Sequence, residues 1–147
     1  MYANVVEMAK TQPFTVRLEP GLEDRIARLA KLAKRSKGSI LEELADEAER
    51  MRRYPGLGFR GPEGARRAWI VGTSLDVWQV IEAFSDFGRD VERMVAETDL
   101  TRRQLDIALA YYREFRREID EAIAANRPTA QQVEADYPFI RTVTSDR

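Results

Sequence analysis

The chain has 147 residues, 44% of them apolar and 33% charged, and its formal net charge is −1; this composition is typical of a globular protein with exposed helices. No apolar run approaches the roughly 18 to 20 residues of a membrane-spanning helix, and the N-terminus lacks the basic start and apolar middle of a secretion signal. The sequence contains no cysteine and no histidine, which excludes disulfides and thiolate chemistry and removes the commonest general base and transition-metal ligand. We therefore expect a cytoplasmic protein that has no membrane contact, metal or cofactor and is not an enzyme.

The first predicted element is a β-strand near the N-terminus. Within QPFTVRLEPG, residues 12–21, apolar and polar side chains alternate in the period-two pattern of a strand with one buried face. The alternating residues are Phe14, Thr15, Val16, Arg17 and Leu18. The next fifty residues have the pattern of helices and offer no second strand. A lone strand leaves its backbone donors and acceptors without ladder partners, so its partner has to come from elsewhere.

Two amphipathic helices are predicted next. The first runs from about Gly21 to Arg35, and Ser36 is placed to cap the second, which ends before the glycine- and proline-rich stretch at residue 54. The apolar stripes are Leu22, Ile26, Leu29, Ala30 and Ala33 in the first helix and Ile40, Leu44, Ala48 and Met51 in the second. Neither helix is long enough to bury its stripe alone.

Basic residues cluster on the first helix and on the turn that follows it. Six lysines or arginines and no acidic residue lie between Arg25 and Lys37, both included. A one-sided basic patch on a small domain is one signature of nucleic-acid binding. On charge alone, a solvated helix face is the simpler interpretation.

Residues 13–51 resemble the ribbon-helix-helix family of bacterial and phage repressors and antitoxins. The likeness rests on the short strand, on the T-x-R pattern of Thr15 and Arg17, and on the serine that opens the second helix. In that family two chains intertwine, their single strands pair antiparallel, and the two-stranded ribbon enters the major groove of DNA. The resemblance therefore implies a homodimer, in which a second copy supplies the missing strand, bound to operator double-stranded DNA.

The resemblance and the strand pattern together predict the DNA contacts. Thr15 and Arg17 project from the face opposite the apolar residues, where arginine suits guanine O6 and N7 and threonine suits a base edge or a thymine methyl group. Gln12 or Lys10 extends this base-reading face. At the start of the second helix, free N–H groups and the positive dipole end suit a DNA phosphate. The predicted phosphate contacts are Arg35, Ser36, Lys37 and Ser39. Ser36 would cap the helix in either case.

The composition changes after the second helix. Residues 54–64, YPGLGFRGPEG, hold two prolines and four glycines and are predicted to be a linker. The fold is expected to be mainly α, with a small helical domain after the linker. The expected parts are a dimerising DNA-binding domain at 1–53, the linker at 54–64, a helical domain at 65–126 and an extended tail at 127–147.

The helical domain is predicted to begin with a short strand at Trp69–Val71, followed by a helix that Asp76 caps and Gly88 ends. A short helix comes next, and a capping box at Thr101 then opens one long helix through about Asn126. The apolar stripe of the long helix is Leu105, Ala108, Leu109, Tyr112, Phe115, Ile119 and Ile123. The aromatic residues expected in the core are Trp78, Phe84, Tyr112 and Phe115.

This second domain resembles a small winged-helix-like family known as domain of unknown function 433, which has the patterns I-x-G-T-R-I-x-V and L-T…A-L-x-Y-Y. The matching residues are Gly72, Thr73, Val77, Leu100, Thr101, Ala108, Leu109 and Tyr112. Ser74 stands where that family has arginine and Asp76 where it has proline, so a binding role of that arginine is not carried over. Members are commonly encoded beside PIN-like nucleases, which implies an antitoxin with a PIN-like toxin as its partner.

The tail ends in YPFIRTVT, which is aromatic and β-branched but too short to fold alone. A short helical turn is expected before it, at about residues 129–135. The end segment either pairs with its own domain or orders along a partner. A PIN-like nuclease holds metal with carboxylates, and a guanidinium pairs with carboxylates bidentately and keeps its charge. The predicted toxin-binding residues are therefore Tyr137, Phe139, Ile140 and Arg141.

Two functions remain open on the sequence. The first is the antitoxin of a type II toxin–antitoxin system, which binds operator DNA as a dimer and represses its own transcription while it neutralises a PIN-like ribonuclease. The alternative is a stand-alone ribbon-helix-helix transcriptional repressor without a toxin partner. The carboxylates lie beside basic residues on helix faces, and no glycine-rich phosphate loop or nucleophile elbow is present, so an enzyme is the least favoured class.

Overall fold

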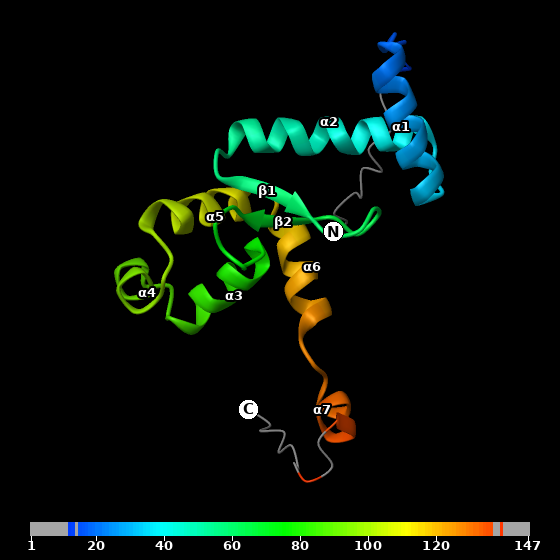
Figure 1. Ribbon diagram of the computed structural model, residues 1–147. Coiled ribbons are helices and arrows are strands. Elements are labelled where there is room, and N and C mark those ends of the chain that lie inside the picture. The colour runs from blue at the N-terminus through cyan, green and yellow to red at the C-terminus, as the bar shows by residue number, and fades with distance from the viewer. Residues whose placement is uncertain (1–11, 14, 137–138, 140–147) are drawn as a thin grey trace, which may run out of the picture. The chain divides into compact units, whose positions relative to one another are not determined.

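The computed structural model describes residues 12–13, 15–136 and 139 and is mainly helical, as predicted (Figure 1). Its elements are α1 (Pro20–Ala33), α2 (Lys37–Arg53), β1 (Leu57–Arg60), β2 (Arg67–Ile70), α3 (Val77–Asp86), α4 (Val91–Glu97), α5 (Arg102–Glu114), α6 (Arg116–Asn126) and α7 (Ala130–Asp136). Among the described helices, none combines the length and the apolar character needed to cross a bilayer. The chain folds as two compact units, unit 1 (Met1–Leu44) and unit 2 (Ala45–Arg147), so the division falls inside α2 and not at residue 53.

The two helices predicted in unit 1 are confirmed. α1 begins at Pro20, whose fixed φ suits the first helical position. It ends at Lys34, which adopts a left-handed conformation with φ 53°. Ser36 caps α2 as predicted, because its Oγ accepts a hydrogen bond of 3.1 Å from the N–H of Ser39.

The core of unit 1 is small. Among the described residues of this unit, the fully buried apolar side chains are Ile26, Ala30 and Ile40. The partly buried residues that pack on them are Leu18, Leu22, Leu29, Ala33 and Leu41. Residues 12–13 and 15–19 adopt no regular secondary structure and pair with no described strand of the same chain. The strand at this position therefore stays a prediction that depends on a second chain.

Unit 2 contains an antiparallel hairpin where a linker was expected. β1 and β2 pair in a register that sets Leu57 opposite Ile70 and Arg60 opposite Arg67. Leu57 is only 3% exposed and belongs to the core. The predicted linker at 54–64 is therefore wrong over residues 57–60, and the strand predicted at 69–71 begins and ends earlier, at 67–70.

The glycines of this stretch serve the hairpin and not chain flexibility. Gly56 has a φ of 106°, which L residues with a side chain rarely adopt. Gly58 lies opposite Trp69, and an added Cβ would lie 3.0 Å from the indole ring. A glycine-rich composition therefore marks tight backbone geometry at this point, a meaning that composition alone does not distinguish from a linker.

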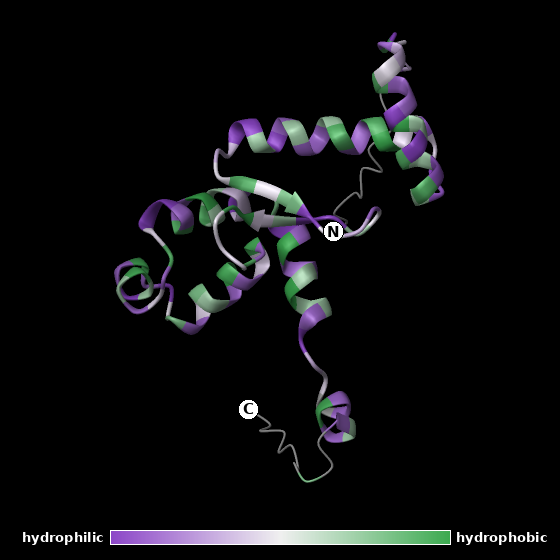
Figure 2. Ribbon diagram, in the orientation of Figure 1, coloured by the Kyte–Doolittle hydropathy of each residue, from purple (hydrophilic) through white to green (hydrophobic). Residues whose placement is uncertain are grey.

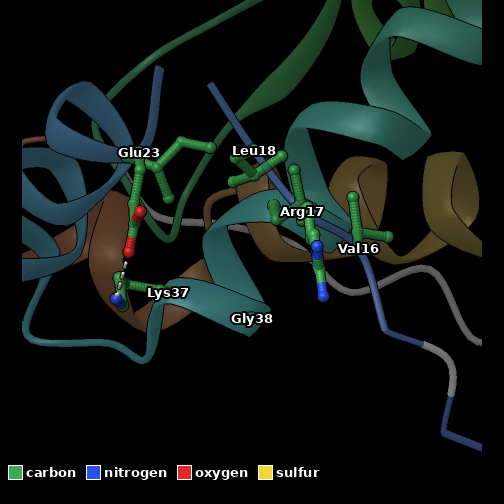
Figure 3. A pocket seen from close by; sticks show the side chains of 8 residues that line it. Val16, Arg17, Leu18, Glu23, Lys37 and Gly38 are labelled. Atoms are coloured by element: carbon green, nitrogen blue, oxygen red, sulfur yellow. Dashed lines mark hydrogen bonds and ion pairs between the residues drawn. The ribbon is translucent and has the colours of Figure 1, made fainter. Parts of the chain in front are cut away.

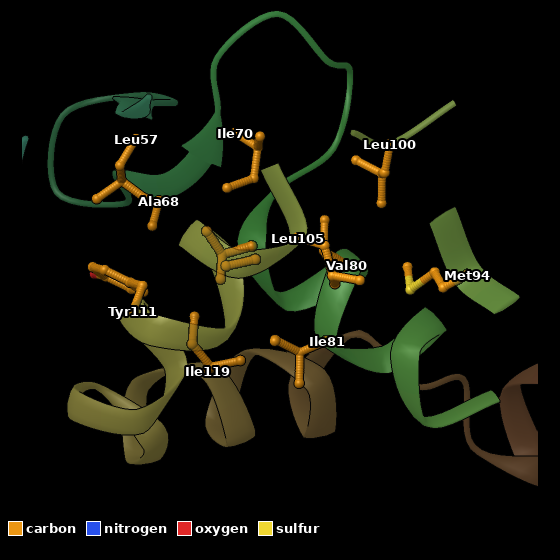
Figure 4. Close-up of a cluster of buried hydrophobic side chains, with 12 residues drawn as sticks. Leu57, Ala68, Ile70, Val80, Ile81, Met94, Leu100, Leu105, Tyr111 and Ile119 are labelled. Carbon is orange, nitrogen blue, oxygen red and sulfur yellow. The ribbon is translucent and has the colours of Figure 1, made fainter. Parts of the chain in front are cut away.

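The helices of unit 2 begin where the caps predict. Asp76 precedes α3 and its N–H donates to Gln79 Oε1 at 2.8 Å. Thr101 and Gln104 form the predicted capping box of α5. Short helices also follow at α4 and α7, as expected. The buried core that these elements share is Leu57, Ala68, Ile70, Val77, Val80, Ile81, Met94, Leu100, Leu105, Ala108, Tyr111 and Ile119 (Figure 4).

The single long helix predicted from Thr101 to Asn126 is wrong, because α5 and α6 are separated at Phe115. The backbone of Phe115 has φ −108° and ψ 39°, outside the helical range. Both helices pack on α3 (Figure 1), and the break lets Leu105 and Ile119 reach one core. Two helices that pack on the same core have the same apolar periodicity as one, so the stripe did not reveal the break.

Candidate nucleic-acid interface

Two of the residues predicted to contact DNA, Arg17 and Lys37, line a groove in unit 1. The groove has a volume of about 490 Å³ and is lined by Val16, Arg17, Leu18, Glu23, Ile26, Lys37, Gly38 and Leu41 (Figure 3). One part of this lining is apolar and continues the small core, and the other part is charged. Figure 3 shows the side chain of Arg17 extended away from the pair formed by Glu23 and Lys37.

The base-reading residues predicted from the sequence are all accessible. Gln12, Thr15 and Arg17 are exposed. Val16, predicted to face a dimer core, is 48% exposed in the single chain, although Leu18 packs partly on the core of unit 1. The single chain therefore leaves both faces of this segment in solvent, and a second chain would be needed to cover one of them.

The residues predicted to bind phosphate gather at the start of α2. The guanidinium of Arg35 donates to Ser39 Oγ at 2.7 Å and to Glu43 at 2.8 Å, so both side chains are held by contacts inside unit 1. Lys37 lies 3.2 Å from Glu23, and both side chains are more than half exposed. An exposed pair of this kind contributes little, about 0.2 to 1 kcal/mol, and is easily exchanged for a phosphate. Ser36 and Lys37 are thus the most accessible of the four.

The apolar stripe predicted on α2 is covered only at its start. Ile40 is 1% exposed, whereas Leu44 and Met51 are each 40% exposed and Ala48 is also exposed. Figure 2 shows hydrophobic and hydrophilic residues alternating along this helix. The last three members of the stripe are therefore not buried within the single chain. An apolar row on one helix face that meets solvent is the usual mark of a helix that packs on a partner.

The contacts that the last turns of α2 make with α5 and α6 were not predicted from the sequence. Arg50 has a side chain only 17% exposed, and its guanidinium donates to Tyr111 Oη at 2.7 Å and to Glu118 at 2.8 Å. The same group lies 3.9 Å from the centre of the Phe115 ring, within range of a cation–π contact. Tyr111 itself is fully buried, although the predicted stripe passed it over in favour of Tyr112.

The pKa values of this cluster follow from its contacts. Burial by itself lowers the pKa of Arg50, but the hydrogen bonds from Arg50 to Glu118 and Tyr111 and their electrostatic attraction outweigh it, so the pKa is raised. Burial and the nearby charge of Glu118 raise the pKa of the Tyr111 hydroxyl. Arg50 therefore stays a cation and Tyr111 a neutral phenol over the ordinary pH range.

A second charged cluster was also missed, at the loop end of the hairpin. Asp76 is buried, and its two oxygens accept from Arg60 Nε at 2.8 Å and from Arg67 Nε at 2.7 Å. Burial alone would raise the pKa of this carboxyl, but the two arginines together lower it below its usual value. Since Arg60 and Arg67 lie opposite each other across the strands, the carboxylate cancels their repulsion.

Of the four toxin-binding residues predicted in the tail, one lies within the described residues. Tyr137, Ile140 and Arg141 lie outside the described residues, and Phe139 is 82% exposed. Within the described part of the chain, no group of three or more acidic side chains is arranged to hold a metal ion. Comparison of the chain with protein-family models, with curated proteins and with solved structures finds no match.

Proposed function

We propose that the protein is a homodimeric DNA-binding protein that acts as the antitoxin of a type II toxin–antitoxin pair. The observation that carries the dimer is the exposed apolar row on α2, formed by Leu44, Ala48 and Met51 and named below the α2 stripe. Unit 1 has so few buried residues that a single chain leaves much of its apolar surface in water. A second copy that packs stripe against stripe would cover that surface, since a twofold interface places the same residues on both sides.

Charge supports DNA as the ligand of such a dimer. Arg17 and Thr15 are exposed beside the groove, and Lys37 stands at the N-terminal end of α2 with a weakly held partner. A strand pair formed by two copies of residues 14–18 would present both copies of Arg17 to a major groove about 12 Å wide. The helix start would meet the phosphate backbone, which fixes the register of the ribbon.

The antitoxin role rests on the resemblance of unit 2 to the winged-helix-like family and on the aromatic tail. In this proposal the tail, through Arg141 and its aromatic neighbours, binds a PIN-like ribonuclease in the cytoplasm. The second candidate, a repressor without a toxin, is favoured by the self-contained core of unit 2, which needs no protein partner to fold. A co-expression growth assay separates the two: the antitoxin restores growth to cells that express a PIN-like toxin encoded beside it, and deletion of residues 128–147 abolishes the rescue without loss of DNA binding.

Sedimentation over a range of protein concentrations tests the dimer. Leu44→Glu places a charge on the α2 stripe and is expected to weaken the dimer by about 2 kcal/mol or more, roughly thirtyfold in Kd. The matched control is Leu32→Glu, because Leu32 is 79% exposed and lies on α1, outside the stripe. Equal effects of the two changes would exclude the α2 stripe as the interface.

Gel-shift titrations at two salt concentrations test DNA binding. The logarithm of the binding constant is expected to fall with the logarithm of salt concentration by about 0.9 for each phosphate neutralised. Arg17→Ala is expected to lose about 1 to 3 kcal/mol on the operator and to relax sequence preference, whereas Lys37→Ala weakens all sequences alike. The absence of any shift at low salt would overturn the proposal.

A further inference from the structure

Three side chains in the last turns of α2, at every third position, bind residues of other parts of unit 2. Glu47 is 8% exposed and accepts two hydrogen bonds from Arg66, at 3.0 and 3.2 Å, beside the hairpin. Arg50 binds Tyr111 on α5 and Glu118 on α6. Arg53 lies 2.7 Å from Glu114, at the end of α5. Each of these turns therefore has a partner in unit 2; Arg50 and Arg53 lie on a face of α2 different from that of the α2 stripe, whereas Glu47 borders it.

Arg50 is the central contact of this anchor. Besides Tyr111 and Glu118, its guanidinium donates to Asp46 at 3.1 Å, one turn back on the same helix. Tyr111 is fully buried and its hydroxyl also donates to Glu118 at 3.0 Å. Removal of the guanidinium would leave a buried hydroxyl and a carboxylate without the cation that joins them, which is costlier than the loss of an exposed pair.

The second half of α2 has little support of its own. α2 has 17 residues in all, of which residues 45–53 belong to unit 2, and most helical stability in proteins comes from packing against other elements. Two members of the α2 stripe, Ala48 and Met51, lie on this part. Whether these two residues are presented on a regular helix therefore depends on the contacts that unit 2 makes with its other face.

We infer that Arg50 is a positioning residue for dimerisation: by binding Tyr111, Glu118 and Phe115 it holds residues 45–53 helical and keeps the α2 stripe in register for a second copy. The inference rests on the proposed dimer and adds its regulation. Unit 2 controls the interface through Arg50, although Arg50 contacts neither the second copy nor DNA. A ligand or partner that displaces Glu118 from Arg50 would weaken the dimer and, with it, DNA binding.

The test uses the full chain and compares Arg50→Ala with Arg52→Ala. Arg52 is exposed on the same turn of α2 and has no ion pair with a described carboxylate, so the control removes a guanidinium without removing the anchor. Hydrogen exchange of the amides of residues 47–53 reports the helix, and sedimentation reports the dimer. For Arg50→Ala we expect protection of these amides and dimer affinity to fall by about tenfold or more, with neither change in Arg52→Ala.

Two further variants separate positioning from a general loss of fold. Tyr111→Phe keeps the buried ring and removes only the hydroxyl, so a smaller loss of protection, confined to α2, is expected. Arg50→Lys keeps the charge but not the planar fork, and is expected to rescue the dimer only in part. The fluorescence of Trp69 and Trp78, both in unit 2, should stay native in Arg50→Ala, Arg50→Lys and Tyr111→Phe. If Tyr111→Phe and Arg50→Ala leave amide protection and dimer affinity at the level of Arg52→Ala, the inference is wrong.

Failure of the proposed dimer gives a different result. A wild-type chain that sediments as a monomer at all concentrations overturns the dimer and with it the regulatory role. The exchange measurement then still decides whether Arg50 holds residues 47–53 helical. Loss of protection without a dimer would limit Arg50 to the fold, whereas a dimer that is indifferent to Arg50 would overturn the inference alone.

Discussion

The two units of the chain differ in how far each completes its own core. Among the described residues, twelve fully buried apolar side chains form the core of unit 2 and three form that of unit 1. Unit 2 draws its core from a hairpin and four helices, whereas unit 1 has α1, the start of α2 and an unpaired segment. Since burial of apolar surface is the main favourable term in folding, unit 2 has a larger core of its own, and the small core of unit 1 is what the proposed dimer would complete.

The charged residues show the same difference. In unit 2, Arg60 and Arg67 of the hairpin bind Asp76, and Arg50 and Arg53 of α2 bind Glu118 and Glu114. In unit 1, by contrast, Arg25 and Lys31 on α1 and Lys34 at its C-cap are exposed and have no ion pair with a described carboxylate. In the proposed function, these unpaired cations of unit 1 would be the ones that meet a DNA phosphate.

The largest expected effects come from truncations in the two cores. Leu105→Ala and Ile40→Ala each remove a side chain that is at most 1% exposed and are each expected to cost about 2 to 5 kcal/mol. The two units are expected to differ in whether their melting temperatures depend on protein concentration. Loss of Leu105 lowers the melting temperature of unit 2 by the same amount at every concentration, because that core lies within one chain.

Loss of Ile40 destabilises unit 1, whose folding is coupled to dimerisation in the proposed function. The melting temperature of unit 1 should therefore rise with protein concentration, in wild type and in Ile40→Ala alike, because mass action favours the dimer. Circular dichroism melts of wild type and both variants over about a hundredfold concentration range make the measurement. If the melting temperature of unit 1 is independent of concentration, the contrast between a complete unit and an incomplete one fails.

A smaller effect is expected from the carboxylate under the hairpin. Asp76→Asn keeps a cap residue at the start of α3 but leaves Arg60 and Arg67 opposite each other without a counter-charge, at a cost of about 1 to 3 kcal/mol near neutral pH. The pKa of Asp76 is lowered in the folded protein. Its contribution to stability is therefore fully present above its unfolded pKa and is lost as the pH falls through the folded one.

The difference in free energy of unfolding between wild type and Asp76→Asn should accordingly be constant from about pH 5 to pH 7 and should shrink below about pH 4. Urea titrations at a series of pH values measure it. The control is Asp106→Asn, because Asp106 is exposed and pairs only with Arg102 at 3.3 Å. A difference that persists unchanged at pH 2 would show that the charge of Asp76 is not what stabilises the hairpin.

Features of the fold that are settled within a few residues were predictable from the sequence. Ser36 and Thr101 accept hydrogen bonds from backbone N–H groups three residues ahead, and Gly88 has the positive φ of a helix end. Each of these signals is complete in a short window, so the caps and most helix ends were predicted correctly. The predicted DNA contacts at the start of α2 lie together for the same reason, since Arg35 to Ser39 are neighbours in sequence.

The predictions were wrong where contacts between residues far apart in the sequence determine the local structure. Leu57 forms a strand because Ile70 pairs with it, which a glycine-rich window cannot reveal. Phe115 leaves the helix because both flanking helices pack on α3. Arg50 was given no role from the sequence, because its contact with Tyr111 joins residues sixty-one positions apart. The sequence around Arg50 does not indicate which distant hydroxyl or carboxylate its guanidinium binds.

The smallest effect tests whether the glycine-rich stretch at residues 54–64 is packed into unit 2 or is a linker. Gly56 and Gly64 both have positive φ, 106° and 81°, so alanine is strained at either position, by about 1 to 2 kcal/mol. A Cβ at position 56 would also lie 2.8 Å from Ile107 Cδ1, whereas nothing lies within 4 Å at position 64. The steric term therefore adds about 1 kcal/mol to Gly56→Ala alone. Urea unfolding of the two variants, monitored by the tryptophans of unit 2, measures this difference directly. Because both variants carry the same kind of backbone strain, an equal loss of stability would mean that residue 56 is as loosely packed as a linker.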